Sequence, residues 1–558
     1  MPYSADMKKL IEVVEKTRPE RLQKSRDGVE FPAKGPEERK EVLDKFHPDY
    51  KPAGRCKIVV GPNKGEDKTY PEEVVRQLQT KSRIDPKLID PSKIWKEAEV
   101  LVLGGGGAAA ATALMAAKNG AKVLMATKLR FGDANTVMAE GGIQGSDQEC
   151  DSPYYHYLDI LGGGHFTNKP ELVSALAHDA PLVLNWLEEM GMMFDKYPDG
   201  RMRVRHGGGT SRKRMHSAAD LTGAEIMRVL RDEVRNHPDQ VDIVEFAPAV
   251  ELILDKDKRI WGAVLFNLET EEYHIVKAKA VVLATGGFGR LHIQGFPTTN
   301  HYGATMDGIV MAYRCGVPTQ FLYSVQYHPT GAIYPEPLIG LLITEKVRGL
   351  GANVLNVHGN QFVFEREPRD VEAASIIQEC TERGNGVPTA SGNFGVWLDS
   401  PMINMLEGPG TIERALPGKL IQFRRHGIDI TKEPILVFPT LHYQNGGIEI
   451  DENGATRVEG LYGAGEVVGG IHGENRLMGN SLLDITVFGR RAGAAAAKYA
   501  KKRTSFGDPT LDHVVAFNKE VDEAKLDDPT VGPMLLPDYT SQEVHERQLT
   551  SRYLGTLR

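Results

Sequence analysis

The sequence predicts an α/β fold organised around a Rossmann-like βαβ unit in residues 100–128, and three observations lead to it. Residues 100–103 and 123–125 are short apolar runs, which predict two buried strands. Between them, residues 104–109 form a Gly-rich turn that leads into a run of small residues typical of a closely packed helix. A strand, a Gly-rich turn, a helix and a second strand in this order bind a dinucleotide, because its pyrophosphate lies at the helix N-terminus.

The glycine pattern and the end of the second strand indicate which dinucleotide binds. Gly104, Gly106 and Ala109 occupy the three positions of the G-x-G-x-x-G/A motif. Such a motif can also be a plain structural turn, but its place between a strand and a helix favours dinucleotide binding. NAD would favour an acidic residue after the second strand, to hold the ribose hydroxyls. Because Thr127 and Lys128 stand there instead, the sequence indicates FAD.

Length and composition limit the classes of protein that remain. The chain has 558 residues, of which 41 % are hydrophobic and 25 % charged, so it predicts a globular protein of about two to four domains. The formal net charge of -8 argues against a general nucleic-acid binder. The chain has no apolar run of about 18 residues and no apolar export signal, so we expect a cytoplasmic protein that spans no membrane.

The cysteines predict reduced thiols rather than a disulfide framework or a metal site. They lie far apart in the sequence and form no C-x-x-C pair. We therefore expect no metal on this chain, and any iron–sulfur cluster would belong to a partner protein. The four residues are Cys56, Cys150, Cys315 and Cys380.

Residues 1–97 precede the βαβ unit and carry no catalytic pattern. They are polar, charged and interrupted by prolines, with helix-like pieces at residues 7–15 and 72–79. We interpret this segment as an extension that wraps the protein surface or docks a partner.

The chain that follows the βαβ unit alternates loops, helices and strands. Residues 135–142 form a Gly-ended loop that could run beside a flavin, and residues 169–190 read as an amphipathic helix. The basic, Gly-rich segment 201–209 is either a solvated turn or a loop close to a small anion. Residues 242–266 predict paired strands, and residues 280–287 predict a buried strand that ends in a Gly turn. The nucleotide-binding layer is therefore expected to be interrupted and resumed.

Several polar residues in the second half of the chain form candidate binding or catalytic groups. His328 precedes a proline, which disfavours helix. Thr344, Glu345 and Arg348 have the spacing of one helical face, and Pro368 opens a helix-like run. Each residue alone could be a capped histidine, a surface ion pair or a solvated arginine. The full set, which makes a site more probable, also contains Arg369, His442 and Arg476.

These residues lie in ordered blocks, and over residues 98–500 the chain resembles the flavoprotein subunits of the succinate dehydrogenase/fumarate reductase family, which includes L-aspartate oxidase. The blocks are 104–109, 139–142, 218–223, 284–287, 305–308, 328–331, 344–349, 368–370, 442–447, 463–466 and 472–481. The resemblance implies a split FAD-binding domain with an inserted cap and the active site between them. The expected parts are the extension (1–97), the FAD-binding domain (98–321 and 441–500), the cap (322–440) and a short C-terminal helical tail (501–558).

The resemblance also implies a role for each candidate residue. His328 and Thr344 would bind one carboxylate of a C4 dicarboxylate, and His442 and Arg476 the other, since a guanidinium matches the two oxygens of a carboxylate. Arg369 would deliver a proton to the substrate carbon, re-supplied through Glu345 and Arg348, after hydride transfer from flavin N5. The residues expected to contact FAD are Gly104, Gly106, Gly107, Ala108, Thr127, Lys128, Asn135, Thr136, Glu140, Gly141, Gly142, Ala284, Thr285, Gly286, Asp307, Glu466, Asn480, Ser481 and Leu482.

Three departures from the family pattern sharpen the prediction. Asn135 stands where respiratory members carry the histidine that attaches FAD, so we expect non-covalent FAD and a lower flavin potential that favours alkene reduction. His206 stands where aspartate oxidases have a glutamate that faces the substrate amino group and respiratory enzymes have a phenylalanine. A histidine supplies no anion for an ammonium group, yet it leaves room for a substituted fumarate. The C-terminal tail is shorter than is usual in the family.

The sequence therefore predicts the catalytic subunit of a fumarate reductase or succinate dehydrogenase type enzyme, working in the fumarate-reducing direction. An iron–sulfur subunit is the expected partner, and any membrane association would come through partners. The alternatives are L-aspartate oxidase, a reductase of a substituted fumarate, and a non-catalytic flavin subunit through which electrons enter a complex.

Overall fold

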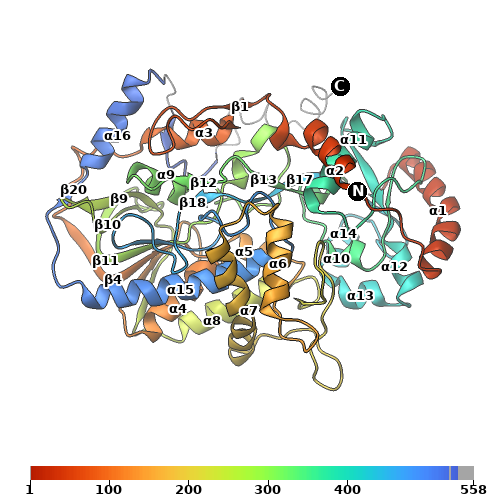
Figure 1. The fold of residues 1–558 in the computed structure, drawn as a ribbon, viewed down its shortest axis with the longest axis horizontal. Helices are drawn as coiled ribbons and strands as arrows, with labels where there is room; N and C mark the ends of the chain where they lie inside the picture. The colour runs from red at the N-terminus through yellow and green to blue at the C-terminus, as the bar shows by residue number, and fades with distance from the viewer. Residues whose placement is uncertain (1, 527–529, 538–558) are drawn as a thin grey trace.

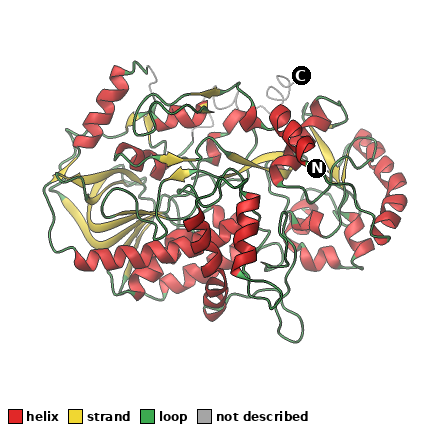
Figure 2. Ribbon diagram, in the orientation of Figure 1, coloured by secondary structure: helices red, strands yellow, loops and turns green. Residues whose placement is uncertain are grey.

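The computed structural model describes residues 2–526 and 530–537, and its largest layer is an eight-stranded mixed sheet (Figures 1 and 2). Its strands are β4 Ile94–Leu103, β5 Val123–Ala126, β8 Val241–Val244, β9 Ala249–Asp255, β10 Ile260–Phe266, β11 Tyr273–Leu283, β19 Leu461–Gly463 and β20 Pro509–Thr510. Their order is β20-β9-β10-β11-β4-β5-β8, and β19 pairs with β11. The pairs among β4, β5, β8, β11 and β19 are parallel, whereas those that involve β9, β10 or β20 are antiparallel.

Two helices, α4 Gly107–Lys118 and α15 Asn480–Lys502, run side by side along one face of this sheet (Figure 1). They approach closely because small residues line the contact. A Cβ added at Gly489 would lie 2.8 Å from the Ala108 carbonyl oxygen, and one added at Gly493 would lie 2.3 Å from that of Thr112. With β4 and β5, α4 forms the βαβ unit that the sequence predicts. Another helix, α9 Asp307–Arg314, packs against β9.

A second, five-stranded antiparallel sheet forms the cap, toward the right of Figure 1. Its strands follow the order β13-β17-β16-β14, and β15 pairs with β16. They are β13 Val325–Ala332, β14 Val354–Leu355, β15 Val387–Pro388, β16 Phe394–Leu398 and β17 Ile435–Gln444. The helices of this region are α10 Lys346–Gly349, α11 Arg369–Thr381, α12 Pro401–Leu406, α13 Thr411–Ala415 and α14 Pro417–Arg424.

Local structure in the cap differs from the sequence expectation in three places. The domain boundary expected after residue 440 falls inside β17. The helical face expected over residues 341–348 is wrong, because α10 is a single turn and Thr344 precedes it in extended chain. The spacing nevertheless brings Glu345 and Arg348 to the same site, since Glu345 is the N-cap of that turn. Pro368 is the N-cap of α11, one position before the predicted first turn.

The N-terminal extension packs against both sheets of its own chain (Figure 1). Its helix α1 Ala5–Arg26 contacts α12, and α2 Pro36–Phe46 contacts α11. Farther along, α3 Glu72–Leu78 contacts α9 beside the larger sheet. The extension therefore runs from the cap to the nucleotide-binding layer. The two helix-like pieces read from the sequence fall within α1 and α3, whereas α2 is an additional helix.

The remaining described elements complete the fold. The helix α7 matches the amphipathic helix expected at residues 169–190, and α16 is the described helix of the C-terminal tail; residues 527–529 and 538–558 of that tail lie outside the described part. None of the described helices combines the length and apolar character needed to cross a membrane. Over the described residues, no cluster of His, Cys, Asp or Glu is arranged to hold a metal ion. These elements are β1 Arg55–Cys56, β2 Tyr70–Pro71, β3 Lys81–Ser82, α5 Asn135–Met138, β6 Ile143–Gln144, α6 Pro153–Gly163, α7 Pro170–Glu189, β7 Met215–His216, α8 Thr222–Arg235, β12 Thr319–Gln320, β18 Gly447–Ile448, α16 Asp512–Glu523 and β21 Val531–Gly532, with short 3-10 turns η1 Pro48–Tyr50, η2 Gly289–Leu291, η3 Ile293–Gly295 and η4 Glu336–Leu338.

Candidate active site

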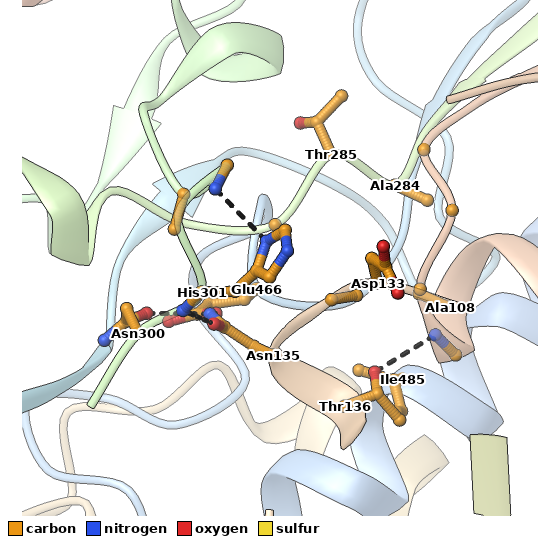
Figure 3. A pocket seen from close by; sticks show the side chains of 18 of the residues that line it. Ala108, Asp133, Asn135, Thr136, Ala284, Thr285, Asn300, His301, Glu466 and Ile485 are labelled. Atoms are coloured by element: carbon orange, nitrogen blue, oxygen red, sulfur yellow. Dashed lines mark hydrogen bonds between the residues drawn. The ribbon is translucent and has the colours of Figure 1, made fainter. Parts of the chain in front are cut away.

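A cavity lies at the carboxyl ends of β4, β5 and β11 and follows the Gly-rich turn before α4 (Figure 3). Gly104 has a φ of +140°, and an added Cβ would lie 2.1 Å from the Ala284 carbonyl oxygen, so the turn requires glycine there. The N-terminus of α4 faces this cavity with its free backbone N–H groups, which favours an anionic ligand.

Most of the predicted FAD-contacting residues line the cavity, and four do not. Of these four, Glu140 lies behind the wall, where its carboxylate contacts Lys419 Nζ at 2.5 Å. Asn480 begins α15, and its Oδ1 lies 3.2 Å from His156 Nε2. Gly141 and Gly142 complete the four. The predicted residues on the lining are Gly104, Gly106, Gly107, Ala108, Thr127, Lys128, Asn135, Thr136, Ala284, Thr285, Gly286, Asp307, Glu466, Ser481 and Leu482.

Lys128 follows β5 at the position where an acidic residue would indicate NAD. Its Nζ donates to Asp307 Oδ2 at 2.5 Å and to Thr305 Oγ1 at 2.7 Å. The lysine side chain is 13 % exposed. Its charge is therefore neutralised within the protein, and Lys128 and Asp307 present a polar wall to the ligand rather than a net charge.

Asn135 begins α5, and its side-chain amide is held at both ends (Figure 3). Its Nδ2 donates to Asn300 Oδ1 at 2.7 Å and to Glu466 Oε2 at 3.0 Å, while its Oδ1 accepts from His301 N at 2.6 Å. Burial raises the pKa of Glu466 to about 7, although the Asn135 hydrogen bond opposes the shift. An amide suits this position, because it donates to the carboxyl group and accepts from the backbone at once.

Near the cap, two guanidiniums converge on one amide oxygen. Gln326 Oε1 accepts from Arg369 Nη1 at 3.0 Å and from Arg476 Nη2 at 2.9 Å. Its Nε2 donates to Asn475 Oδ1 and to the Arg476 carbonyl, which fixes the amide orientation. Arg476 also lies over the Tyr443 ring, 4.5 Å from its centroid. We call Arg369, Arg476 and Gln326 the site cluster.

Arg476 has no carboxylate partner within ion-pair distance in the described part of the chain, and its Nε is buried without a hydrogen-bond acceptor there. Burial lowers the pKa of Arg476 to about 9, and the charge of Arg369 adds to the shift. A buried cation in this state favours the binding of an anion.

A chain of alternating charges leads away from Arg369. Arg369 Nε donates to Glu345 Oε2 at 3.0 Å, and Arg348 Nη2 lies 3.7 Å from the same oxygen. Arg348 Nη1 in turn contacts Glu372 and donates to the Glu365 carbonyl. Burial alone would raise the pKa of Glu345, but Arg369 and Arg348 outweigh it and hold the pKa below its ordinary value. Burial lowers the pKa of Arg369, whereas it raises that of Glu372 well above the usual range.

The predicted substrate-binding histidines and threonine lie beside the site cluster. The His328 and His442 rings meet edge to face, 5.1 Å apart, and His442 also lines the cavity. Thr299 Oγ1 lies 2.8 Å from His442 Nδ1. Burial, followed by repulsion from Arg369, lowers the pKa of both histidines well below the ordinary value. Thr344 is 1 % exposed. The neutral histidines and the hydroxyl provide hydrogen bonds, and the arginines provide charge.

Comparison with known proteins decides the family. A family described as an FAD binding domain matches residues 99–482. The chain is 36 % identical over 462 residues to a flavoprotein named as a subunit of the CoM/CoB fumarate reductase of Methanothermobacter marburgensis, covering 81 % of this chain and 80 % of that one. It is 34 % identical over 425 residues to L-aspartate oxidase of Streptomyces coelicolor, covering 74 % and 70 %. The chain therefore belongs to the succinate dehydrogenase and fumarate reductase flavoproteins.

The solved structure of the FrdA protein of Escherichia coli quinol fumarate reductase has the same fold as this flavoprotein. The two superpose with a TM-score of 0.69 at 32 % identity, over 77 % of this chain and 74 % of the other. The predicted α/β class, with a Rossmann-like FAD-binding domain and an inserted cap, is confirmed. The chain is an FAD-dependent oxidoreductase of the type that includes fumarate reductases, succinate dehydrogenases and L-aspartate oxidases.

The cavity of this flavoprotein fits the FAD that its family binds. The Gly104 turn brings backbone N–H groups to the cavity, and a Cβ added at Gly105 would lie 2.3 Å from Thr127 Oγ1, so the turn has no room for a larger residue. Thr285 Oγ1, on the lining, is buried without a hydrogen-bond partner in the described part of the chain. A polar atom of this kind is expected where a ligand supplies the missing hydrogen bond.

His206 is not brought into the site cluster of this flavoprotein. Its side chain is exposed on the Gly-rich basic loop, whereas Gly208 of the same loop donates its backbone N–H to Glu345 Oε1 at 2.8 Å. Of the two interpretations of the loop, the structure favours one that reaches the site, but it does so through the backbone rather than through the histidine.

Two residues of the charged network escaped the sequence reasoning. Gln326 lies two positions before His328, and alternate residues of a strand face the same side, so the period of two was the signal that could have found it. Glu372 lies three positions after Arg369 on α11, which is the spacing of one helical face. Asn300 and His301, which hold Asn135, had no signal in the sequence, because they come from a loop far away in the chain.

Proposed function

We propose that this flavoprotein reduces fumarate, or a closely related C4 dicarboxylate, to the saturated acid. The observation that carries the proposal is Arg476, a buried guanidinium without a carboxylate partner in the described part of the chain, which shares the Gln326 oxygen with a second guanidinium. Two converging buried cations favour a dianion. A fork-shaped guanidinium binds a carboxylate with two parallel hydrogen bonds.

The two ends of the dicarboxylate are assigned to two groups of residues. Arg476 and His442 bind one carboxylate, and His328 and Thr344 bind the other. Both histidines are neutral, as their lowered pKa values indicate, so each donates one hydrogen bond without adding charge. Holding both carboxylates polarises the double bond between them. The burial of His328, Thr344 and Arg476 keeps water away from the substrate.

Arg369 is the proposed proton donor. Its Nε and Nη1 are bound to Glu345 and Gln326, which fixes the guanidinium plane. Burial lowers the pKa of Arg369 from its ordinary value, so transfer of its proton to a carbon with carbanion character costs less than it would in water. Glu345, which is held ionised between Arg369 and Arg348, returns a proton to Arg369 after each turnover.

FAD is proposed to bind without a covalent bond, and the chemistry it supplies when bound is a hydride for the double bond. Asn135, at the position of the family's attachment histidine, has no nucleophilic nitrogen for such a bond, and its amide is engaged by Asn300, His301 and Glu466. After acid precipitation of the protein, the yellow colour is expected in the supernatant. Colour that stays with the pellet would contradict non-covalent binding.

The electrons are proposed to come from an iron–sulfur partner protein. The relative from Methanothermobacter marburgensis is by its name one subunit of a fumarate reductase, and the Escherichia coli structure is the FrdA protein of a quinol fumarate reductase. Any attachment to a membrane would come through such a partner.

The test is fumarate-dependent oxidation of a reduced viologen by the purified, FAD-loaded chain, beside Arg369→Lys. We expect the variant to lose about 10²–10⁴-fold in turnover, the usual contribution of a general acid. A lysine keeps the charge but not the fork that Glu345 and Gln326 hold. Turnover of L-aspartate with oxygen, in place of fumarate reduction, would contradict the proposal and favour an L-aspartate oxidase. Absence of both, with FAD bound, would favour a non-catalytic flavoprotein or a substituted substrate.

A further inference from the structure

Residues 47–55 of the N-terminal extension lie directly behind the strand that carries Gln326 and His328. Asp49 Oδ2 accepts the backbone N–H of Val325 at 2.8 Å. Arg55 Nη2 donates to the Tyr323 carbonyl at 3.0 Å. The His47 ring meets the Tyr327 ring edge to face at 5.6 Å. The family match begins at residue 99, so this segment lies outside the part of the chain that the family describes.

The contacts of this strand alternate with its residues. Positions 323, 325 and 327 are the ones that the extension contacts, through two backbone groups and one ring. Positions 326 and 328 face the other way, where Gln326 joins Arg369 to Arg476 and His328 meets His442. A strand presents alternate residues to opposite faces, so whatever holds one face sets the position of the other. The extension therefore forms the back wall of the substrate site.

Asp49 is the residue of this segment whose presence needs a reason. Its side chain is 11 % exposed, its nearest cation is Arg55 at 3.7 Å, and its Oδ1 is buried without a hydrogen-bond partner in the described part of the chain. A buried carboxylate with incomplete pairing destabilises the fold. The bond that it does make, to Val325 N, lies one residue from Gln326.

We propose that Asp49 is a positioning residue for the dicarboxylate site: by holding Val325 N it fixes Gln326 between Arg369 and Arg476. This inference rests on the proposed function. Gln326 Oε1 meets the two guanidiniums at 3.0 and 2.9 Å. Hydrogen bonds of this length weaken steeply when the acceptor moves, so a small shift of the strand start changes the spacing of the two cations. The spacing of the cations determines how well a C4 dianion fits.

The experiment is a titration of the oxidised, FAD-loaded full chain with fumarate, followed by the change in the flavin absorption spectrum. Asp49→Ala removes the acceptor of Val325 N. We expect its Kd for fumarate to rise about tenfold, the effect of one lost hydrogen bond to a charged group, while its FAD content stays that of the parent. Asp49→Asn keeps a side-chain oxygen that accepts from Val325 N, so its Kd is expected to remain within about twofold of the parent.

Asn63→Ala is the matched control. Asn63, from the same extension, is 1 % exposed and holds Thr319 through its Oδ1 and Nδ2 on β12, a strand without a predicted site residue. It should lower the melting temperature without changing the Kd, which separates positioning from a general loss of stability. If Asp49→Ala does not yield folded FAD-loaded protein, Arg55→Met, which frees the Tyr323 carbonyl, replaces it and is expected to weaken binding in the same direction.

The outcomes separate the inference from the proposed function. A parent that shows no saturable response to fumarate would overturn both. A parent that binds fumarate, together with Asp49→Ala or its replacement that binds equally well, would overturn the positioning role alone. An equal rise in Kd in Asn63→Ala would also overturn it, because the effect would then follow from stability. A selective rise in Asp49→Ala, with rescue in Asp49→Asn, supports it.

Discussion

Two groups of buried arginines lie in and beside the cap, and they differ in how their charge is compensated. In the first, Arg18 and Arg21 of α1 both bind the Asp399 carboxylate, with distances of 2.9 Å for Arg18 Nη2 and 2.8 Å for Arg21 Nη2. In the second, the site cluster, Arg369 and Arg476 share the neutral oxygen of Gln326. We call Arg18, Arg21 and Asp399 the α1 cluster.

The difference shows what each group is for. The α1 cluster is complete, since its carboxylate side chain is fully buried and bound by both arginines, which tie α1 to the cap. The charges of the site cluster are complete only in part: Arg369 has Glu345, whereas Arg476 has no carboxylate in the described part of the chain. A buried ion pair that is fully satisfied maintains structure, and a buried cation without a partner favours a ligand. Substitutions in the two clusters should therefore affect different measurements.

The largest expected effect is on stability, from Arg21→Met in the α1 cluster. The variant leaves the fully buried Asp399 with Arg18 alone and also removes the hydrogen bond to Asn353 Oδ1. Breaking one partner of a buried ionic network typically costs about 3–5 kcal/mol. We expect a loss of this size in urea unfolding of the FAD-loaded protein, with the fumarate Kd unchanged. Asp399→Asn in the Arg21→Met background should recover part of the loss, and a changed Kd without a stability loss would contradict the comparison.

The second effect is on binding, from Arg476→Met in the site cluster. Methionine keeps much of the side-chain volume and removes a buried cation that lacks a carboxylate partner among the described residues. Unfolding stability should stay the same or rise. The fumarate Kd should increase by about 30- to 150-fold, which corresponds to about 2–3 kcal/mol for the lost charge-assisted hydrogen bonds. Fluorescence or absorption titration of bound flavin measures it. A variant that binds fumarate like the parent would remove Arg476 from the carboxylate site.

The cofactor half of the cavity was largely predictable from the sequence, because its key contacts are local. The strand, turn and helix around Gly104 are contiguous, and the requirement for glycine follows from backbone geometry. The residues that miss the lining, such as Glu140 and Asn480, lie within the same sequence blocks but point into the protein, toward Lys419 and His156. A block of sequence locates a loop, yet it does not say which of its side chains face the ligand.

The substrate half was predictable only through resemblance, because its members come from distant segments. Gln326, Arg369 and Arg476 are brought together by β13, by the first turn of α11 and by the loop before α15. No local pattern encodes such a meeting. The expected helical face at Thr344 was wrong for a related reason: tertiary contacts to the Gly-rich loop, through Gly208, hold Glu345 where an isolated sequence would continue a helix.

The smallest expected effect concerns Asp49 and Arg55, whose charges are paired less well than the α1 cluster and better than Arg476. Burial raises the pKa of Asp49 to about 7, against the opposing charge of Arg55. A carboxyl whose pKa is higher in the folded than in the unfolded state stabilises the fold fully only below its unfolded pKa, near 3.8, and loses that contribution as pH rises through 7. Asp49→Asn removes this titration while keeping the Val325 hydrogen bond. Between about pH 6 and pH 8, the parent should therefore lose about 1.4 kcal/mol of unfolding stability relative to the variant, the energy of one pKa unit. Parallel pH profiles of parent and variant would show instead that Arg55 keeps Asp49 ionised, which would move this pair into the same class as the α1 cluster.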